Sequence, residues 1–322
     1  MPFLQREIVL DDESSFVGVR IDRCVQQLAG GSRSHVTGLF DHDCVSVNGQ
    51  MEINPGRILS AGDHVFVRFE QNRRYSPRRR PEQQKHRGFS IVHEDADLIV
   101  VDKSAELLTV PTDGREPSTL IYRVSEHVRR TSRERSAILV HRLDRGVSGL
   151  LVFAKRPHAA NDLQSQFAEH KPDRVYLALV AGIVRLETGT FRSYLTTGKN
   201  LTRYSTSDPD AGELAVTHYR VLDQSVGTDP SVQISLVEVR LETGRRNQIR
   251  VHFAEAGHSV IGDARYRPDQ WKNISWPHKR LALHAATLAF LHPTTGQLLS
   301  FHSPLPVEMG RLMKHVGMKL KM

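Results

Sequence analysis

The stretch HRLDRGVSGLLVFAK, residues 141–155, places an aspartate between two arginines and follows it with a glycine turn and an apolar run. The apolar run predicts a buried strand. Two arginines next to Asp144 in sequence would favour its ionised form if they point toward it. An ionised carboxylate can act as a nucleophile or a base, whereas a turn aspartate often binds only backbone N–H groups. The spacing alone leaves both interpretations open.

Net charge and composition limit the classes of function. The 322 residues carry a net charge of +8, with 25% charged and 39% hydrophobic residues. This excess of positive charge favours a polyanionic partner, most often nucleic acid, with an anionic membrane surface as the alternative. We expect a cytoplasmic protein without a membrane span. No apolar run approaches ~20 residues, no secretion signal is evident, and Cys24 and Cys44 make no disulfide framework.

Composition also divides the chain into three expected parts. Residues 1–70 form a small α/β module, 71–88 a basic linker, and 89–322 a larger domain. The linker is rich in arginine and poor in apolar residues, which predicts a flexible tether. Such a tether is either only solvated or also in contact with phosphate groups.

The small module shows two helices and a hairpin. Ile21, Val25 and Leu28 have helical spacing, and Ser32 can cap a second helix. Asn48-Gly49 is a strong hairpin signal, and a closing strand is expected at 62–69.

This module resembles the small RNA-binding domain named after ribosomal protein S-four. The resemblance is carried by Arg20–Arg23, Ser32–Ser34, Val45–Gly49 and Gly62–Asp63. It implies that Arg33, Ser34 and His35, around the second helix, contact RNA phosphates. A solvated helix charge is the alternative for Arg33.

The larger domain predicts an α+β fold built on a large, mainly antiparallel sheet. Residues 89–112 predict a strand, a turn, a second strand and another turn. Further strands are expected at 138–144, 149–155, 174–184, 216–225, 232–244, 281–293 and 297–306. Helices are expected at 118–130, 157–171 and 247–257.

Metal and nucleotide chemistry find little support in the sequence. It has 17 histidines but no His-Glu-x-x-His and no Cys-x-x-Cys pattern, so we expect no metal site. It lacks a glycine-rich phosphate loop of the Walker or Rossmann type, so we expect no nucleotide cofactor.

Two further stretches accompany Asp144. Tyr176, in RVYLALVAG, enters an apolar strand with a polar tip, and a core tyrosine is the alternative reading. Four arginines, including Arg245 and Arg250, fall within residues 240–250 next to the start of a helix, where a solvated basic turn is the alternative.

Together these pieces resemble the RluA-type family of pseudouridine synthases. The matching stretches, in the family's order, are 93–107, 141–155, 174–182, 241–266 and 281–293. The resemblance implies the pseudouridine synthase fold and a cofactor-free isomerisation of uridine in RNA. A module like that of ribosomal protein S-four in front of the catalytic domain is an arrangement this family uses.

The resemblance also assigns roles to single residues. Asp144 is the expected catalytic aspartate, and direct attack on the sugar and a glycal intermediate are both proposed for the family. Tyr176 is expected to pack against the target base, and Arg250 to pair with Asp144. Arg142 is expected to fill the space of the flipped uridine, and Arg245 to contact RNA.

Five positions depart from the family pattern. Pro and Gly are usual where this chain has Ser104 and Glu106, so its turn there must be built differently. Val147 replaces a Thr, which removes a hydroxyl that could brace the loop. Asn247 replaces a His and Ser259 a Pro. These departures put substrate choice in doubt.

The leading hypothesis is a monomeric RNA pseudouridine synthase that acts on structured RNA, either large-subunit ribosomal RNA or transfer RNA. The second is an inactive RNA-binding assembly factor or chaperone on a synthase scaffold. A third, a nucleoside hydrolase or glycosidase that uses Asp144 as nucleophile, lacks the second carboxylate that such chemistry normally needs.

Overall fold

The computed structural model describes the chain in segments. These are residues 3–52, 54–71, 73–75, 88–111, 118–132, 134, 136–198, 200–225, 229 and 232–318. The chain divides into two compact units, Met1–Glu82 and Gln83–Met322. The boundary falls within the expected linker at 71–88, most of which lies outside the described residues. No helix in the described part is long and apolar enough to cross a membrane.

The first unit is a four-stranded sheet with two helices. Its elements are β1 (Phe3–Val9), α1 (Ile21–Ala29), α2 (Arg33–Asp41), β2 (Val45–Val47), β3 (Gln50–Met51) and β4 (His64–Glu70). The sheet order is β1-β4-β2-β3. Both predicted helices and the hairpin are confirmed, and the Ser32 side chain accepts the N–H of His35 as the predicted cap. Strand β1, which pairs with β4, was not predicted from the sequence.

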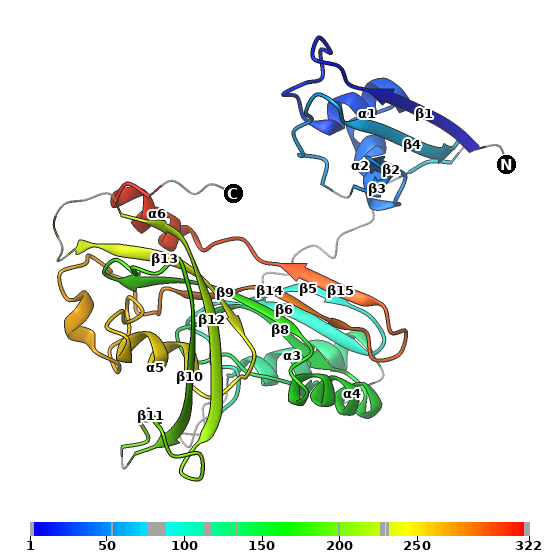
Figure 1. Ribbon diagram of the computed structural model, residues 1–322. Helices are drawn as coiled ribbons and strands as arrows, with labels where there is room; N and C mark the ends of the chain where they lie inside the picture. Colours follow the sequence, from blue (N-terminus) through cyan, green and yellow to red (C-terminus); the bar gives the residue numbers. More distant parts are fainter. Residues whose placement is uncertain are drawn as a thin grey trace. The chain divides into compact units, whose positions relative to one another are not determined.

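The second unit contains one large sheet and four α-helices among its described residues (Figure 1). The strands are β5 (Phe89–Glu94), β6 (Leu98–Lys103), β7 (Ile138–Leu139), β8 (Ser148–Ala154), β9 (Asp173–Ala181), β10 (Thr188–Thr197), β11 (Arg203–Thr206), β12 (Glu213–Gln224), β13 (Ile234–Leu241), β14 (Leu283–Leu291) and β15 (Leu298–His302). The helices are α3 (Leu120–Thr131), α4 (Pro157–Ala168), α5 (Gln248–Glu255), the short 3-10 helix η2 (Pro268–Trp271) and α6 (Val307–His315).

The sheet is antiparallel except where β14 pairs with β8, so the predicted α+β class with a mainly antiparallel sheet is confirmed. Its order is β11-β10-β12-β13-β9-β14-β8-β6-β5, with β15 beside β14 and β7 beside β8. The register places Gly149 and Tyr176 opposite the same residue, Ala285, on β14. A Cβ at Gly149 would lie 2.2 Å from the Ala285 carbonyl oxygen, so only glycine permits this approach. The sheet therefore places the start of β8 and Tyr176 on either side of Ala285, one strand apart.

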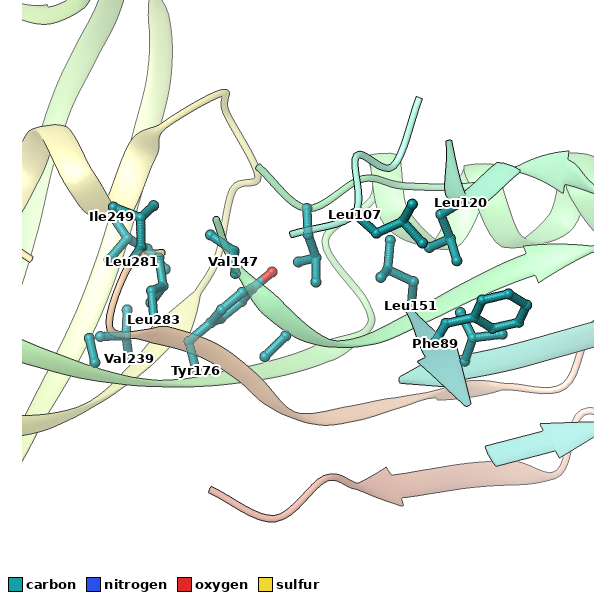
Figure 2. Close-up of a cluster of buried hydrophobic side chains, with 14 of the residues drawn as sticks. Phe89, Leu107, Leu120, Val147, Leu151, Tyr176, Val239, Ile249, Leu281 and Leu283 are labelled. Carbon is teal, nitrogen blue, oxygen red and sulfur yellow. The ribbon is translucent and has the colours of Figure 1, made fainter. Parts of the chain in front are cut away.

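Alternate residues of β6 are buried on opposite faces of the sheet. Ile99 and Val101 belong to a cluster that includes Leu120 of α3 and Tyr176, part of which Figure 2 shows. Leu98 and Val100 belong to a second cluster with residues of α4. Both faces are covered, which explains why β6 and β8 read as continuous apolar runs.

The main departure from the predicted strands lies just before β8. Of the strand expected at 138–144, only Ile138–Leu139 pairs as β7, and residues 140–147 form a loop that we call the Asp144 loop. The Nε2 of His141, inside this loop, accepts the N–H of Val152 at 3.2 Å, so a side chain replaces a backbone partner. The loop frees Asp144 from the sheet.

Candidate active site

A cavity of about 510 Å³ opens beside the Asp144 loop. The loop, β9 and the first turn of α5 all contribute to its wall. All five site residues that the sequence predicts in this unit line it, namely Arg142, Asp144, Tyr176, Arg245 and Arg250. Residues more than a hundred positions apart in sequence thus meet in one place.

A second cavity, of about 790 Å³, shares Arg142, Asp144 and Arg250 with the first. Its wall is strongly basic, with Arg145, Arg246, Arg265, His278, Lys279 and Arg280. Among the described residues that line either cavity, Asp144 is the one carboxylate. A single negative charge therefore faces a basic, two-part recess, which suits a polyanion.

Asp144 is half-buried, and opposing effects act on the pKa of its carboxyl. Burial raises the pKa of its carboxyl above the ordinary value. Arg250 and Arg142 lower that pKa by their positive charge, and the backbone N–H of Asn247 lowers it by hydrogen bonding. The net pKa shift is upward. The arginines thus limit a cost that burial imposes on the ionised form.

Arg250 has a different ion-pair partner from the one expected. Its Nε donates to Asp263 Oδ2 at 2.6 Å and its Nη2 to Asp263 Oδ1 at 2.8 Å. In the described part of the chain no Arg250 nitrogen lies within 4.0 Å of an Asp144 oxygen. The expected direct pair with Asp144 is therefore corrected. Arg250 acts on Asp144 through its charge while Asp263 fixes the guanidinium.

Asn247 accounts for one departure from the family pattern. Its backbone is left-handed, with φ 58°, a conformation that asparagine tolerates better than most residues. Its Oδ1 accepts Arg250 Nη1 at 2.9 Å, and its Nδ2 donates to the hydroxyl of Tyr266 at 3.1 Å. The guanidinium of Arg250 also lies 5.0 Å from the centre of the Tyr266 ring. Asn247 thus helps to hold Arg250 while its own N–H faces Asp144.

Lys103 explains how the chain forms the turn at Ser104 without the usual proline and glycine. Its side chain is 1% exposed, and its Nζ donates to the carbonyls of Ser104 and Leu107 at 2.8 Å each. It also donates to the carbonyl of Val147 in the Asp144 loop. Burial, helped by Arg280, lowers the pKa of Lys103 to about 7. This lysine ties the turn after β6 to the end of the Asp144 loop.

Other hydrogen bonds brace the Asp144 loop despite Val147. The hydroxyl of Thr109 donates to the Leu143 carbonyl at 2.8 Å and accepts the Leu143 N–H at 3.3 Å. Gly146 N–H donates to the Ala105 carbonyl at 3.1 Å. Val147 itself is 2% exposed and packs in the apolar cluster of Figure 2. The missing hydroxyl is thus compensated by Thr109 from outside the loop.

Tyr176 lines the cavity from strand β9. It is 8% exposed, and Figure 2 shows it reaching from β9 toward Val147. Burial raises the pKa of its phenol, so the hydroxyl stays neutral. Its ring and the carboxylate of Asp144 line the same cavity. The arrangement offers a flat apolar surface beside an acidic group, which suits an unstacked base.

Comparisons with known proteins agree with this geometry. A model of the RNA pseudouridylate synthase family matches residues 97–255. An uncharacterized RNA pseudouridine synthase of Chlorobaculum parvum is 32% identical, over 96% of this chain and 97% of its own. The ribosomal large subunit pseudouridine synthase D of Zymomonas mobilis is 32% identical, over 96% of both chains.

The chain belongs to the RluA-type family of RNA pseudouridine synthases. Among solved structures, human RNA pseudouridylate synthase domain containing 4 superposes on the synthase with a TM-score of 0.58 and 19% identity, over 71% of this chain and 94% of that one. That similarity supports the fold of the synthase alone.

The other predicted residues of the synthase lie in the first unit. Arg33 and Ser34 are exposed at the start of α2, and His35 is half-buried. The His35 ring makes edge contacts with Phe69 and Tyr75, with centroid separations of 6.4 and 5.8 Å. Arg33 and Ser34 are accessible to a ligand, whereas His35 also packs against aromatic residues of the first unit.

Several supporting residues of the synthase received no role from sequence. Asp263 lies in the matching stretch 241–266, but the family resemblance implies Asp144 as the partner of Arg250. Thr109 acts 34 positions away in sequence, and nothing near it in the chain points to the loop it braces. Arg174 stands two residues before Tyr176 and also lines the cavity. Among the described residues, no group of three or more His, Cys, Asp or Glu side chains could hold a metal ion.

Proposed function

We propose that this synthase isomerises uridines of structured large-subunit ribosomal RNA, with Asp144 as the catalytic carboxylate. The observation that carries the proposal is the placement of Asp144 as the one carboxylate of the described cavity walls, beside Tyr176 and several arginines. The ribosomal substrate is supported by relatives from Zymomonas mobilis and Pasteurella multocida that are named for the ribosomal large subunit. Transfer RNA is the alternative substrate.

The chemistry breaks the bond between ribose carbon 1 and uracil nitrogen 1. The base then rotates and rejoins the sugar through its carbon 5, which loses its proton, while nitrogen 1 gains a proton in place of its bond to the sugar. Asp144 acts in the first step as an ionised carboxylate, either by attack on carbon 1 or by removing a sugar proton. Uridine and pseudouridine are isomers, so the reaction needs no oxidant or reductant. Water can take up the proton from carbon 5 and supply the proton to nitrogen 1.

Access to the target base requires that it leaves the RNA stack, at a cost of roughly a few kcal/mol. Arg142, exposed on the Asp144 loop, fills the space that the base vacates. Tyr176 stacks on the extruded base, an interaction worth ~1–3 kcal/mol. The basic second cavity holds the flanking strand.

Arg250 keeps Asp144 usable as a charged group. Its positive charge is the largest effect that opposes the rise in the pKa of Asp144. Asp263 and Asn247 prevent the guanidinium from rotating away, since they bind three of its N–H groups. Arg250 contributes to the field around Asp144 at every stage of the reaction.

The first unit is proposed to act as an RNA-binding module like that of ribosomal protein S-four. Arg33 and Ser34 are exposed at the N-terminal end of α2, where backbone N–H groups favour anions. Arg33, Ser34 and His35 would then hold phosphates and increase affinity for structured RNA without taking part in the chemistry.

Mapping of pseudouridine in defined transcripts tests the proposal. Unmodified large-subunit ribosomal RNA and transfer RNA transcripts would each be incubated with the full-length protein, and pseudouridines located by chemical labelling and primer extension. We expect new pseudouridine in the ribosomal transcript. Modification of transfer RNA alone would overturn the substrate assignment. Binding without modification of either would favour the inactive assembly factor.

A further inference from the structure

Arg174, on β9, is a buried cation without an anionic partner. Its side chain is 7% exposed, and in the described part of the chain no carboxylate forms an ion pair with it. Its Nη2 donates to the carbonyls of Leu241 and Glu242 at 3.4 Å each, near the limit for a hydrogen bond. Its buried Nε has no hydrogen-bond partner. Buried arginines are almost always paired, so this guanidinium lacks its normal compensation.

The arginines that line the first cavity differ in what compensates their positive charge. Arg245 pairs with Glu213 at 3.1 Å, and Arg250 pairs with Asp263. Arg142 and Arg246 are exposed to solvent, which compensates their charge. Arg174 is the buried arginine of the described wall that has neither a carboxylate nor open solvent.

The surroundings of Arg174 hold its guanidinium at the cavity wall. Its Cζ lies 5.5 Å from the centre of the Phe167 ring. On another side, a Cβ at Gly244 would come within 2.5 Å of its Nη1, so the glycine leaves room for the guanidinium. Phe167, Gly244 and Arg174 all line the cavity that contains Asp144 and Tyr176. The guanidinium is thus held at the cavity wall as a fixed, planar group of N–H donors, a geometry that matches the oxygens of a phosphate or carboxylate.

We propose that Arg174 binds a phosphodiester group of the RNA next to the uridine that occupies the cavity. This inference rests on the proposed function, because it places the target nucleotide in that cavity. Phosphate is the anionic group of RNA, and the planar guanidinium matches its oxygens through two parallel hydrogen bonds. Arg174 is thereby a substrate-positioning residue, distinct from Asp144, Tyr176 and Arg250.

Variants of Arg174 give the first test. Arg174→Gln removes the charge and keeps a polar side chain, and Arg174→Lys keeps a point charge. We expect Arg174→Gln to raise KM about tenfold with kcat changed less than about threefold, the pattern of lost uniform binding. We expect Arg174→Lys to recover part of the loss. The matched control is Arg220→Gln, an exposed arginine of β12 outside both cavities, which should leave KM unchanged.

Salt dependence separates a phosphate contact from a structural role. Affinity for an unmodified ribosomal hairpin would be measured in the Asp144→Asn background, where turnover is absent. Each phosphate contact contributes a slope of about 0.7 in log Kd against log salt for single-stranded RNA. Arg174→Gln should reduce the slope by about that amount. An unchanged slope in a folded variant would show that Arg174 only braces the wall and would overturn the proposal.

A series of hairpins with one neutral methylphosphonate linkage each would locate the phosphate. At one position near the target uridine, the neutral linkage should weaken RNA binding by the protein that has Arg174. The same linkage should leave RNA binding by Arg174→Gln unchanged. Equal losses in both proteins at every linkage would contradict the proposal. If Arg174→Gln does not fold, Gly244→Ala displaces the guanidinium instead and should raise KM and lower the slope, and unchanged values would overturn the assignment.

The two proposals can fail separately. If the protein with native Asp144 modifies no RNA but Arg174→Gln still lowers the salt slope, the proposed reaction falls and the phosphate contact stands. If modification proceeds and neither the slope nor the methylphosphonate pattern depends on Arg174, the phosphate contact falls alone.

Discussion

Asp263 and Arg250 form a bidentate ion pair, with distances of 2.6 and 2.8 Å, at the edge of the cavity that contains Asp144. The Asp263 carboxylate is fully buried and also accepts the N–H groups of Arg265 and Tyr266. One buried carboxylate thus fixes the guanidinium whose charge helps another carboxylate to ionise. Asp263 balances the charge of Arg250, so that Asp144 remains available to substrate.

Asp263→Asn should therefore impair both stability and activity. Loss of one partner leaves a buried charge uncompensated, which lowers the free energy of unfolding by roughly 3–5 kcal/mol. Chemical denaturation measures this loss, and pseudouridine formation should fall as Arg250 loses its position. The control is Asp173→Asn, which breaks an exposed pair with Arg240. It should cost less than about 1 kcal/mol. Equal losses in both variants would contradict the role given to Asp263.

Asp144→Asn should stabilise the protein at neutral pH while it abolishes activity. Burial raises the folded-state pKa of Asp144, so the ionised form is penalised above that pKa. The amide carries no such penalty. Differential scanning calorimetry should show a higher Tm for the variant near pH 7, and the difference should shrink as the pH falls toward the ordinary aspartate pKa of 3.8. A lower Tm for the variant at neutral pH would argue against a desolvated carboxylate.

Two substitutions of Asn247 separate the contribution of its left-handed backbone to stability from the contribution of its side-chain contacts. Asn247→Gly keeps the left-handed backbone at φ 58° and loses the contacts to Arg250 and Tyr266. Asn247→Ala loses both, so it should be less stable than the glycine variant by about 1 kcal/mol. Both variants should lower kcat, since each removes one of the three hydrogen bonds that hold Arg250. Thermal unfolding and steady-state kinetics check the pair, and an alanine variant as stable as the glycine variant would disprove the backbone argument.

Lys103→Met should weaken the Asp144 loop. Methionine fills a similar volume but leaves the carbonyls of Ser104, Leu107 and Val147 without their donor. Buried carbonyls left unsatisfied cost about 1–3 kcal/mol each, so we expect a loss of several kcal/mol in the free energy of unfolding. Urea denaturation measures it. A loss below about 1 kcal/mol would mean that water replaces the amine.

The sequence predicted those parts of the fold whose signals are local. The spacing of Ile21 and Val25, the cap at Ser32 and the turn at Asn48-Gly49 each act within a few residues, and each prediction is confirmed. The strands β1, β10 and β11 and the helix α6 were not identified. β1 is mostly exposed and shows little apolar alternation, so only its pairing with β4 defines it.

In the site, too, residues within sequence motifs could be predicted, whereas their partners across the fold could not. Asp144, Tyr176 and Arg250 were selected from motifs, and the described sheet brings them to one cavity. The partner of Arg250 could not be read from spacing, because Asp144 and Asp263 are both acidic residues in matched motifs. Only the geometry shows which carboxylate is buried against the guanidinium. The unpaired state of Arg174 likewise depends on contacts that no local pattern encodes.

Release of tritium from uracil carbon 5 shows directly whether Asp144 drives uridine isomerisation. Bulk RNA with tritium at uracil carbon 5 would be incubated with the wild type, with Asp144→Asn and with the surface control Asp173→Asn. We expect tritium release by the wild type and the control, and none by Asp144→Asn. Release by Asp144→Asn at the wild-type rate, or no release by the wild type from RNA that it binds tightly, would contradict this expectation.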